Sequence, residues 1–191
     1  EDLYNLAVEK SSPVLEKAAK EVKDKFVIVV EDTVKAIGQI AKLKRQMYNI
    51  PVVAITGSVG KTSTKDMIYS VVATKYKTLK TQGNMNNEIG MPLTILNLKD
   101  EEALVLEMGM NHLGELSRLT NIAKPTIAVI TNVGTAHIGN LGSRENILKA
   151  KLEILEGLND EGVAIINNDN DLLHKWYEKN KNKIEIHTFG I

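Results

Sequence analysis

Residues 55–63 read Ile-Thr-Gly-Ser-Val-Gly-Lys-Thr-Ser, and this stretch decides the fold that we predict for the chain. The residues before it, from Val52, form an apolar run, and those after it, to Val72, have helical periodicity. A strand, a tight glycine turn and the start of a helix therefore coincide. Glycine allows the backbone to wrap around an anion, and the first amides of the helix point at that anion with the helix dipole in favour.

This arrangement predicts a phosphate-binding loop for a nucleoside triphosphate. Lys61 would lie along the outer phosphates, and the Thr62 hydroxyl would hold Mg²⁺. The strict pattern requires a glycine five positions before Gly60, where this chain has Ile55, so the loop is a shortened form in which Gly57 takes that role. The alternative, a glycine turn with a solvated lysine, is disfavoured because three signals coincide.

Composition limits the possible partners. The 191 residues are 43% hydrophobic, enough for one sizeable core, and 24 basic residues cancel 24 acidic ones. We therefore expect no nucleic-acid partner and no anionic membrane surface. The chain has no cysteine, no signal-peptide pattern and no apolar run of membrane-spanning length, which favours the cytoplasm. It begins with Glu1, so we expect a fragment of a longer protein.

Strand-like and helix-like segments alternate along the chain. Apolar runs of strand length lie at 26–30, 52–56, 103–107, 127–132, 163–167 and 184–188, and several are continuous, as in strands buried on both faces. Helical patterns lie at 33–49, 62–75, 114–123, 143–158 and 170–182. We predict an α/β fold, a mostly parallel sheet with helices on both faces. Ligands then bind beyond the carboxyl ends of the strands, where we place the phosphate loop, Glu107, Asn132 and Asn167.

The first residues differ from the rest. Residues 1–25 are rich in lysine and glutamate, with Pro13 between two short helical patterns. Asp32 or Thr33 is suited to cap the helix that follows. We assign residues 1–32 to the remainder of a preceding domain plus a linker, and residues 33–191 to the nucleotide-binding domain.

Two residues at predicted strand ends are candidates for metal binding. Glu107 ends the strand at 103–107, beside the phosphate loop, where a carboxylate can hold Mg²⁺; the alternative is an ordinary acid at a strand end. A glycine close behind it, Gly109, favours the functional reading. His137 follows the strand at 127–132 on the same sheet edge. Its spacing fits contact with a metal or phosphate and a structural role equally well.

Lys151 interrupts an apolar stripe. It shares a predicted helix face with Ile147, Leu155 and Leu158. The simpler interpretation is that its stem is buried while its ammonium reaches water. The alternative is a desolvated lysine whose neutral amine captures carbon dioxide, which gives a carbamate that can bind Mg²⁺. Periodicity alone favours the simpler interpretation.

Other polar segments are less informative. Residues 81–94 are dense in amides and glycines, which suits a polar substrate, although a plain turn before a helix is the commoner explanation. Residues 167–171 form a strand-to-helix turn with capping residues. We interpret His174 and His187 as structural or solvated.

Taken together, five segments resemble the Mur ligase family, the ATP-dependent amide-forming enzymes of peptidoglycan synthesis. The matching segments are 56–63, 83–94, 107–112, 131–137 and 149–154. The phosphate loop, including its shortened form, and His137 are shared across the superfamily. Segments 83–94 and 107–112 are similar to one branch, which adds the dipeptide D-Ala-D-Ala to UDP-MurNAc-tripeptide.

The resemblance implies a P-loop NTPase-like central domain and a role for each motif residue. It implies nucleotide binding by Thr56, Gly57, Ser58, Val59, Gly60, Lys61, Thr62 and Ser63. It implies that Thr62 and Glu107 hold one Mg²⁺ and that His137 and a carbamylated Lys151 serve a second one. The implied catalytic residues are Lys61, Glu107, His137 and Lys151. It places the peptide-bearing substrate near Asn84, Asn86, Asn87, Asn111 and His112.

The implied reaction has two steps. The tripeptide carboxylate attacks the γ-phosphate of ATP to give an acyl phosphate, and the amine of D-Ala-D-Ala then displaces phosphate. Family members have three domains, so the resemblance also implies that this chain holds most of the central ATP-binding domain, lacks the C-terminal ligase domain, and is inactive alone. We expect the enzyme to be monomeric.

Two other readings remain open. One is another amide ligase of the superfamily, such as a diamino-acid-adding enzyme, folylpolyglutamate synthase or cyanophycin synthetase; the asparagine-rich segment argues against these. The other is a noncatalytic nucleotide-binding module. The presence of Thr62, Glu107, His137 and Lys151 together argues against it, because such a module needs no second metal site.

Overall fold

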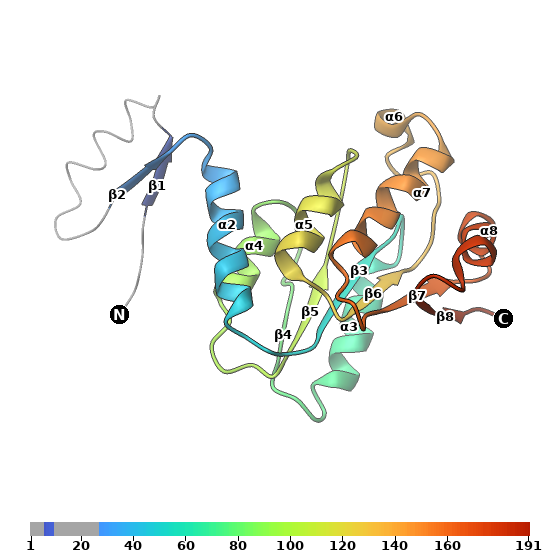
Figure 1. The fold of residues 1–191 in the computed structure, drawn as a ribbon, viewed down its shortest axis with the longest axis horizontal. Coiled ribbons are helices and arrows are strands. Elements are labelled where there is room, and N and C mark those ends of the chain that lie inside the picture. The colour runs from blue at the N-terminus through green and yellow to red at the C-terminus, as the bar shows by residue number, and fades with distance from the viewer. Residues whose placement is uncertain (1–5, 10–26) are drawn as a thin grey trace.

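A parallel sheet of six strands forms the body of the protein (Figure 1). The computed structural model describes residues 6–9 and 27–191. The strand order is β4-β5-β3-β6-β7-β8, and every neighbouring pair is parallel. The strands are β3 (Val52–Thr56), β4 (Thr78–Lys80), β5 (Ala103–Glu107), β6 (Ile127–Ile130), β7 (Val163–Asn167) and β8 (Glu185–Phe189). The predicted α/β class is confirmed.

Helices connect successive strands. They are α2 (Thr33–Gln46), α3 (Lys61–Val72), α4 (Gly90–Leu96), α5 (Glu115–Ala123), α6 (Ile138–Leu141), α7 (Arg144–Leu152) and α8 (Asp171–Asn180), with a 3₁₀ helix, η1 (Glu153–Gly157), directly after α7. Asp32 caps α2 by accepting a hydrogen bond from the Lys35 N–H, as predicted. Asn170 caps α8 in the same way. Among the described residues, no helix is long and apolar enough to cross a lipid bilayer.

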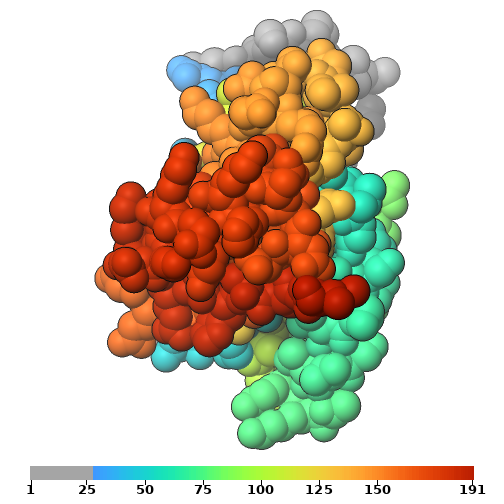
Figure 2. Space-filling model, turned by 90° about the vertical axis from the view of Figure 1, so that its right-hand side faces the viewer, coloured from blue at the N-terminus to red at the C-terminus, as the bar shows by residue number. Residues whose placement is uncertain are grey.

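The two faces of the sheet are covered unequally. Alternation along β3 directs Val52 and Ala54 to one face, where they meet buried side chains from α2, α4, α5, α7, η1 and α8. Val53 and Ile55 point to the other face, where the smaller cluster includes Ile68 of α3. Figure 2 shows α8 and β8, in red, closing one end of the molecule, with the α3 segment in green beside them. The prediction of helices on both faces holds, with α3 on the second face.

The segment at 26–30 is a strand but does not join this sheet. β2 (Val27–Val30) pairs in parallel with β1 (Leu6–Glu9) in a separate two-stranded sheet. It stands apart at the left of Figure 1, connected to the body through α2. Residues 6–9 are therefore extended, whereas the sequence suggested short helical patterns there; the rest of those patterns lies outside the described residues.

The helix predicted at 143–158 changes character in the structure. It is α-helical only to Leu152 and continues as η1. Gly157 packs against α5 so tightly that a Cβ on it would lie 2.2 Å from the Thr120 carbonyl oxygen. Only glycine fits at this contact between η1 and α5. β4, α4 and α6 were not among the predicted elements. β4 and α6 have three and four residues and are too short to show a period.

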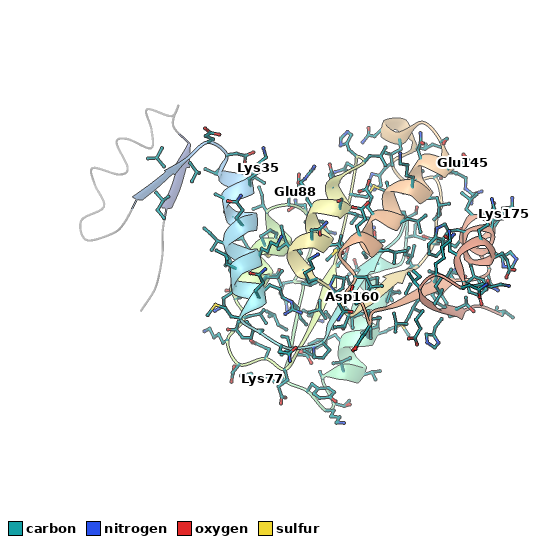
Figure 3. The ribbon with its side chains drawn as sticks, viewed as in Figure 1. Lys35, Lys77, Glu88, Glu145, Asp160 and Lys175 are labelled. Carbon is teal, nitrogen blue, oxygen red and sulfur yellow. The ribbon has the colours of Figure 1, made fainter. Side chains whose placement is uncertain are left out.

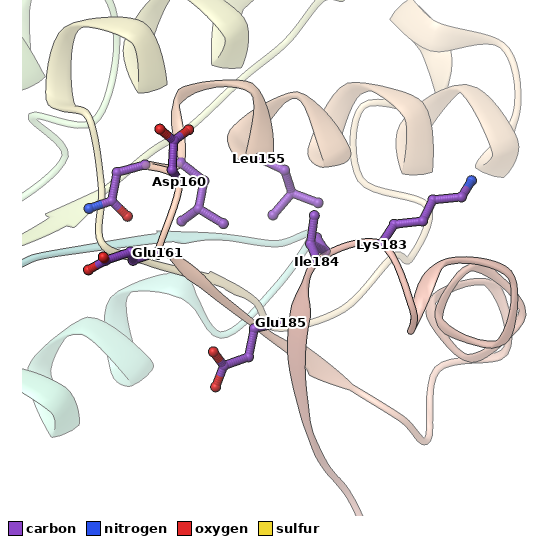
Figure 4. A pocket seen from close by; sticks show the side chains of 9 residues that line it. Leu155, Asp160, Glu161, Lys183, Ile184 and Glu185 are labelled. Atoms are coloured by element: carbon purple, nitrogen blue, oxygen red, sulfur yellow. The ribbon is translucent and has the colours of Figure 1, made fainter.

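A hollow lies at the amino edge of the sheet, opposite the edge where ligands were predicted to bind. In Figure 3, Lys77 lies just before β4 at the amino edge, while Glu88 and Glu145 lie toward the carboxyl edge. A hollow of about 330 Å³ at the amino ends of β7 and β8 is lined by Asp160, Glu161 and Glu185. Figure 4 shows these three carboxylates pointing in different directions. They do not converge on a common point, so the hollow has the character of a surface groove.

Candidate active site

The phosphate loop at the carboxyl end of β3 depends on two glycines. Gly60 has φ of 82°, in the left-handed region that favours glycine, and directly precedes α3, whose first amides have no side-chain cap. Gly57 lies so close to β6 that a Cβ on it would be 1.8 Å from Thr131 Oγ1. The loop therefore leaves the amino end of α3 open to an anion.

The end of β6 holds this loop in shape. Asn132 Oδ1 accepts hydrogen bonds from the N–H groups of Ser58 and Val59, each at 3.0 Å. Thr131 Oγ1 donates to the Val59 carbonyl at 2.6 Å, and the Gly134 N–H donates to Ser58 Oγ at 2.9 Å. Sequence reasoning placed Asn132 at this edge but gave it no role. The signal was available, because an amide directly after a neighbouring strand can reach the loop.

We expect Gly57→Ala to damage the loop because the new methyl group collides with Thr131. The free energy of unfolding should fall by about 2 kcal/mol, the usual scale of overpacking. Affinity for ADP should fall about tenfold or more, because loop and helix amides lose their alignment. Urea denaturation and a fluorescent ADP analogue measure the two effects. Gly139→Ala is the matched control, since a Cβ there meets nothing within 4 Å. Equal ADP affinity in Gly57→Ala and wild type would contradict the assignment.

Glu107 ends β5 as a buried carboxylate, 2% exposed. Its Oε2 accepts from Thr62 Oγ1 at 2.9 Å, and its Oε1 accepts from Asn86 Nδ2 at 2.8 Å. The Glu107 N–H donates to Thr81 Oγ1 at 3.0 Å, which fixes the backbone as well. Within the described residues, Glu107 forms no salt bridge. A buried carboxylate without a cation is costly, so the site is suited to receive one.

The chemistry of these groups fits Mg²⁺. A hydroxyl and a carboxylate are hard oxygen donors, and Mg²⁺ is commonly held by one or two carboxylates together with phosphate oxygens and water. In the described part of the chain, no group of three His, Cys, Asp or Glu residues could hold a metal alone. Nucleotide phosphates would therefore have to supply most of the remaining ligands.

A pocket of about 370 Å³ brings part of the predicted site together, and neither His137 nor Lys151 lines it. Its lining comes from the phosphate loop, the start of α3, the asparagine-rich segment and β5: Gly60, Lys61, Thr62, Ser63, Gly83, Asn84, Asn86 and Glu107. Lys61 Nζ donates to the Gly57 carbonyl at 3.0 Å, so its ammonium lies back over the loop. Thr56 and Ser58 are buried beneath the loop, and neither lines the pocket.

His137 and Lys151 lie at the same sheet edge. His137 precedes α6 with φ of 65°, an uncommon conformation for a residue other than glycine. His137 is exposed at the surface, yet loss of part of its hydration lowers its pKa, the positive charges of Lys151 and Lys61 lower it further, and Glu115 opposes them. A neutral imidazole is therefore favoured near pH 7, which is the form that binds a metal.

Lys151 is almost completely withdrawn from water. Its side chain is 1% exposed, and its ammonium forms no hydrogen bond or ion pair with the described residues. Burial, with a smaller effect of Lys61, lowers the pKa of Lys151 to about 7. The simpler interpretation drawn from periodicity, an ammonium extending into solvent, is wrong. The neighbouring turns curl into η1 and leave Leu155 and Leu158 only partly buried, while Ile147 and Lys151 face the core.

The predicted substrate residues separate into two groups. Asn84 and Asn86 line the pocket, whereas Asn87 Oδ1 accepts the Gly90 N–H at 2.9 Å and so supports the start of α4. Asn111 and His112 are exposed and do not line it. Both are held by one residue that the sequence analysis missed. Glu115 accepts the Asn111 N–H at 2.7 Å and lies 3.1 Å from His112 Nδ1.

Comparison with known proteins agrees with this geometry. Residues 55–191 match the family model of the Mur ligase middle domain. This chain belongs to the Mur ligase family. It is 50% identical over 152 residues to UDP-N-acetylmuramoyl-tripeptide–D-alanyl-D-alanine ligase of Bacillus subtilis (strain 168), an alignment that covers 79% of this chain and 33% of that enzyme. This Mur ligase middle domain thus spans about a third of the length of that relative.

Solved structures give the same result for the fold. The crystal structure of MurF from Acinetobacter baumannii superposes with a TM-score of 0.84 at 35% identity, covering 97% of this chain and 40% of that one. MurF ligase from Thermotoga maritima in complex with ADP gives a TM-score of 0.84 at 34% identity, covering 98% of this chain and 41% of that one. The six-stranded α/β fold described above is therefore the fold of the MurF structures.

Proposed function

We propose that the whole protein uses ATP to join the tripeptide carboxylate of UDP-MurNAc-tripeptide to the amine of D-Ala-D-Ala, a step of peptidoglycan precursor synthesis in the cytoplasm. One observation carries the proposal. The chain is 50% identical to UDP-N-acetylmuramoyl-tripeptide–D-alanyl-D-alanine ligase of Bacillus subtilis, and in it the buried Glu107 carboxylate accepts hydrogen bonds from both the start of α3 and the asparagine-rich segment. We propose that residues 33–191 act as its central domain, that residues 1–32 belong to the substrate-binding side, and that the enzyme is monomeric.

The proposed chemistry assigns work to groups at the sheet edge. The open amides at the start of α3 and the Lys61 ammonium would hold the β- and γ-phosphates and orient the γ-phosphate. Thr62 and Glu107 would hold Mg²⁺, which supplies Lewis-acid stabilisation of the charge that develops on the transferring phosphoryl group. A carboxylate oxygen of the tripeptide attacks the γ-phosphorus as the bond to ADP breaks. The D-Ala-D-Ala amine then attacks the acyl carbon, loses a proton, and phosphate leaves.

His137 and Lys151 would serve a second cation. The buried Lys151 amine, with a pKa of about 7, is substantially unprotonated at neutral pH and can add carbon dioxide. We propose that it is carbamylated and that His137, kept neutral by its surroundings, is its partner. Enzyme equilibrated with ¹³C-labelled bicarbonate should show a carbamate carbon resonance that is missing from Lys151→Met.

The substrate residues stay proposals with different geometric support. Asn84 and Asn86 line the pocket directly. Asn87 supports α4, and Asn111 and His112 form an exposed loop anchored by Glu115. We propose that these last three contact the peptide-bearing substrate when it is bound.

A substrate panel with the whole protein tests the assignment. We expect an amide product, detected by mass spectrometry, from ATP, UDP-MurNAc-tripeptide and D-Ala-D-Ala. Products with meso-diaminopimelate, lysine, glutamate or arginine as the amine, and none with D-Ala-D-Ala, would favour another ligase of the superfamily. No product and no phosphate release with any pair would favour a noncatalytic nucleotide-binding module.

A further inference from the structure

The asparagine-rich segment makes a direct side-chain contact with the Glu107 carboxylate. We propose that Asn86 is a positioning residue, which orients the Glu107 carboxylate for a divalent cation, and that binding of the peptide substrate is not its main role. The inference rests on the proposed function in one respect, namely that Glu107 holds the cation that accompanies the nucleotide.

The two oxygens of Glu107 are held from different elements. Thr62 at the start of α3 donates to Oε2, and Asn86 in the loop after β4 donates to Oε1. An ionised carboxylate can only accept hydrogen bonds, so the amide of Asn86 must present its NH₂ group to it. These bonds fix the rotation of the carboxylate about its last side-chain bond before any cation arrives. Pre-orientation of this kind by a second shell of residues raises metal affinity.

Asn86 is itself held rigidly. Its backbone carbonyl accepts the Gly109 N–H at 2.8 Å, and its backbone N–H donates to the Asn84 backbone carbonyl at 2.7 Å. Gly109 lies two residues after Glu107, so the loop is attached to the chain on the far side of the carboxylate as well. A Cβ on Gly109 would lie 3.0 Å from Asn86 Oδ1, tighter than ordinary contact. The absence of a side chain at Gly109 thus lets the Asn86 amide lie flat against the end of β5.

Asn84 and Asn86 of the asparagine-rich segment are placed for different roles. Asn86 is half-buried and lines the same pocket as Lys61, Thr62 and Glu107. Its Nδ2 already donates to Glu107, while the exposed Asn84 beside it has no side-chain hydrogen bond within the described residues. The segment therefore offers one asparagine to the metal site and another to whatever enters the pocket.

The test uses the whole protein with Mn²⁺ as the probe, in the presence of saturating ADP, followed by electron paramagnetic resonance or calorimetry. We expect Asn86→Ala to weaken Mn²⁺ binding by about 10- to 100-fold. ADP affinity in EDTA should stay unchanged, and the KM for UDP-MurNAc-tripeptide should change less than kcat. Gln82→Ala is the matched control, since that exposed side chain belongs to the same loop and does not line the pocket.

Gly109→Ala tests the same contact without changing Asn86, because the new methyl group should push the Asn86 amide away from the Glu107 carboxylate. It should weaken Mn²⁺ binding in the same direction, and it replaces Asn86→Ala if that variant does not fold. Wild-type Mn²⁺ affinity in the folded variant would overturn the inference, and so would a raised tripeptide KM with unchanged Mn²⁺ affinity. The Mn²⁺ measurement needs no turnover. A whole protein that forms no amide, but loses Mn²⁺ affinity on Asn86→Ala, would refute the proposed function and leave this inference standing.

Discussion

Glu107→Gln in the whole protein should reduce ATP-dependent phosphate release by about 10³-fold or more, because a metal ligand supplies several kcal/mol of transition-state stabilisation. Glutamine keeps the size of the side chain and removes its charge. The same change should leave the free energy of unfolding equal to that of wild type or higher, because the protein buries this carboxylate without an ion-pair partner. Lost turnover with preserved stability would therefore separate a site defect from a folding defect.

Two measurements complete this prediction. Coupled phosphate release gives the rate, and urea denaturation without metal gives the stability. Glu161→Gln is the control, because that exposed carboxylate lies at the amino edge of the sheet, as Figure 4 shows, and should leave both quantities unchanged. Turnover within a few fold of wild type in Glu107→Gln would remove Glu107 from the metal site.

Lys151→Met should reduce turnover by about 10²-fold or more, through loss of the group proposed to serve the second cation. It should also stabilise the protein. Burial holds the pKa of Lys151 near 7, well below its ordinary value of 10.5, so the folded state resists the charged form. Methionine fills a similar volume without that penalty. The gain at pH 6, without carbon dioxide, should be on the order of 5 kcal/mol, because each pKa unit corresponds to about 1.4 kcal/mol.

The gain should depend on pH in a definite direction. The folded amine loses its proton as the pH rises through about 7, whereas the unfolded amine keeps it until about 10.5. The penalty in wild type is therefore complete below pH 7 and fades between pH 7 and 10.5. Urea denaturation of both proteins from pH 6 to pH 9 should show their difference shrinking.

A neighbouring lysine provides the control for this second prediction. Lys149 lies two residues away on α7 and is exposed, so Lys149→Met should change neither turnover nor the pH dependence of stability. A constant stability difference between Lys151→Met and wild type across that pH range would show that the Lys151 amine is not desolvated. Full turnover in Lys151→Met would remove it from the site.

Much of the fold follows from local patterns. Val52–Thr56, Ala103–Glu107 and Val163–Asn167 were predicted to the residue because each is a continuous apolar run that ends in a polar group. Parallel strands place such ends at one edge, so the phosphate loop and Glu107 could be brought together before the structure was known. The short β4 and α6 could not be predicted, since three or four residues carry no readable period.

The candidate site was less predictable because its geometry depends on packing between distant segments. Lys151 shows this limit most clearly. The same helical stripe fits a lysine whose ammonium reaches water and one that is buried in the core. Only the three-dimensional packing of α7 and η1 distinguishes the two cases. The support that Asn132 gives to the phosphate loop and the contact of Asn86 with Glu107 link residues 74 and 21 positions apart. The contact of Asn86 with Glu107 has no local signal in a single sequence, whereas the place of Asn132 at the end of a neighbouring strand was a signal that its amide could reach the loop.

We propose above all that this sheet edge activates a carboxylate by transferring the γ-phosphate of ATP to it. Isotope transfer tests this step most directly. The whole protein is given UDP-MurNAc-tripeptide with both oxygens of its terminal carboxylate labelled with ¹⁸O, together with ATP and D-Ala-D-Ala, and the released phosphate is analysed by mass spectrometry. Phosphate that carries one ¹⁸O atom is the predicted result, because the bridging oxygen leaves with phosphorus. Unlabelled phosphate would show that water, and no carboxylate, attacks the nucleotide, and would contradict the account.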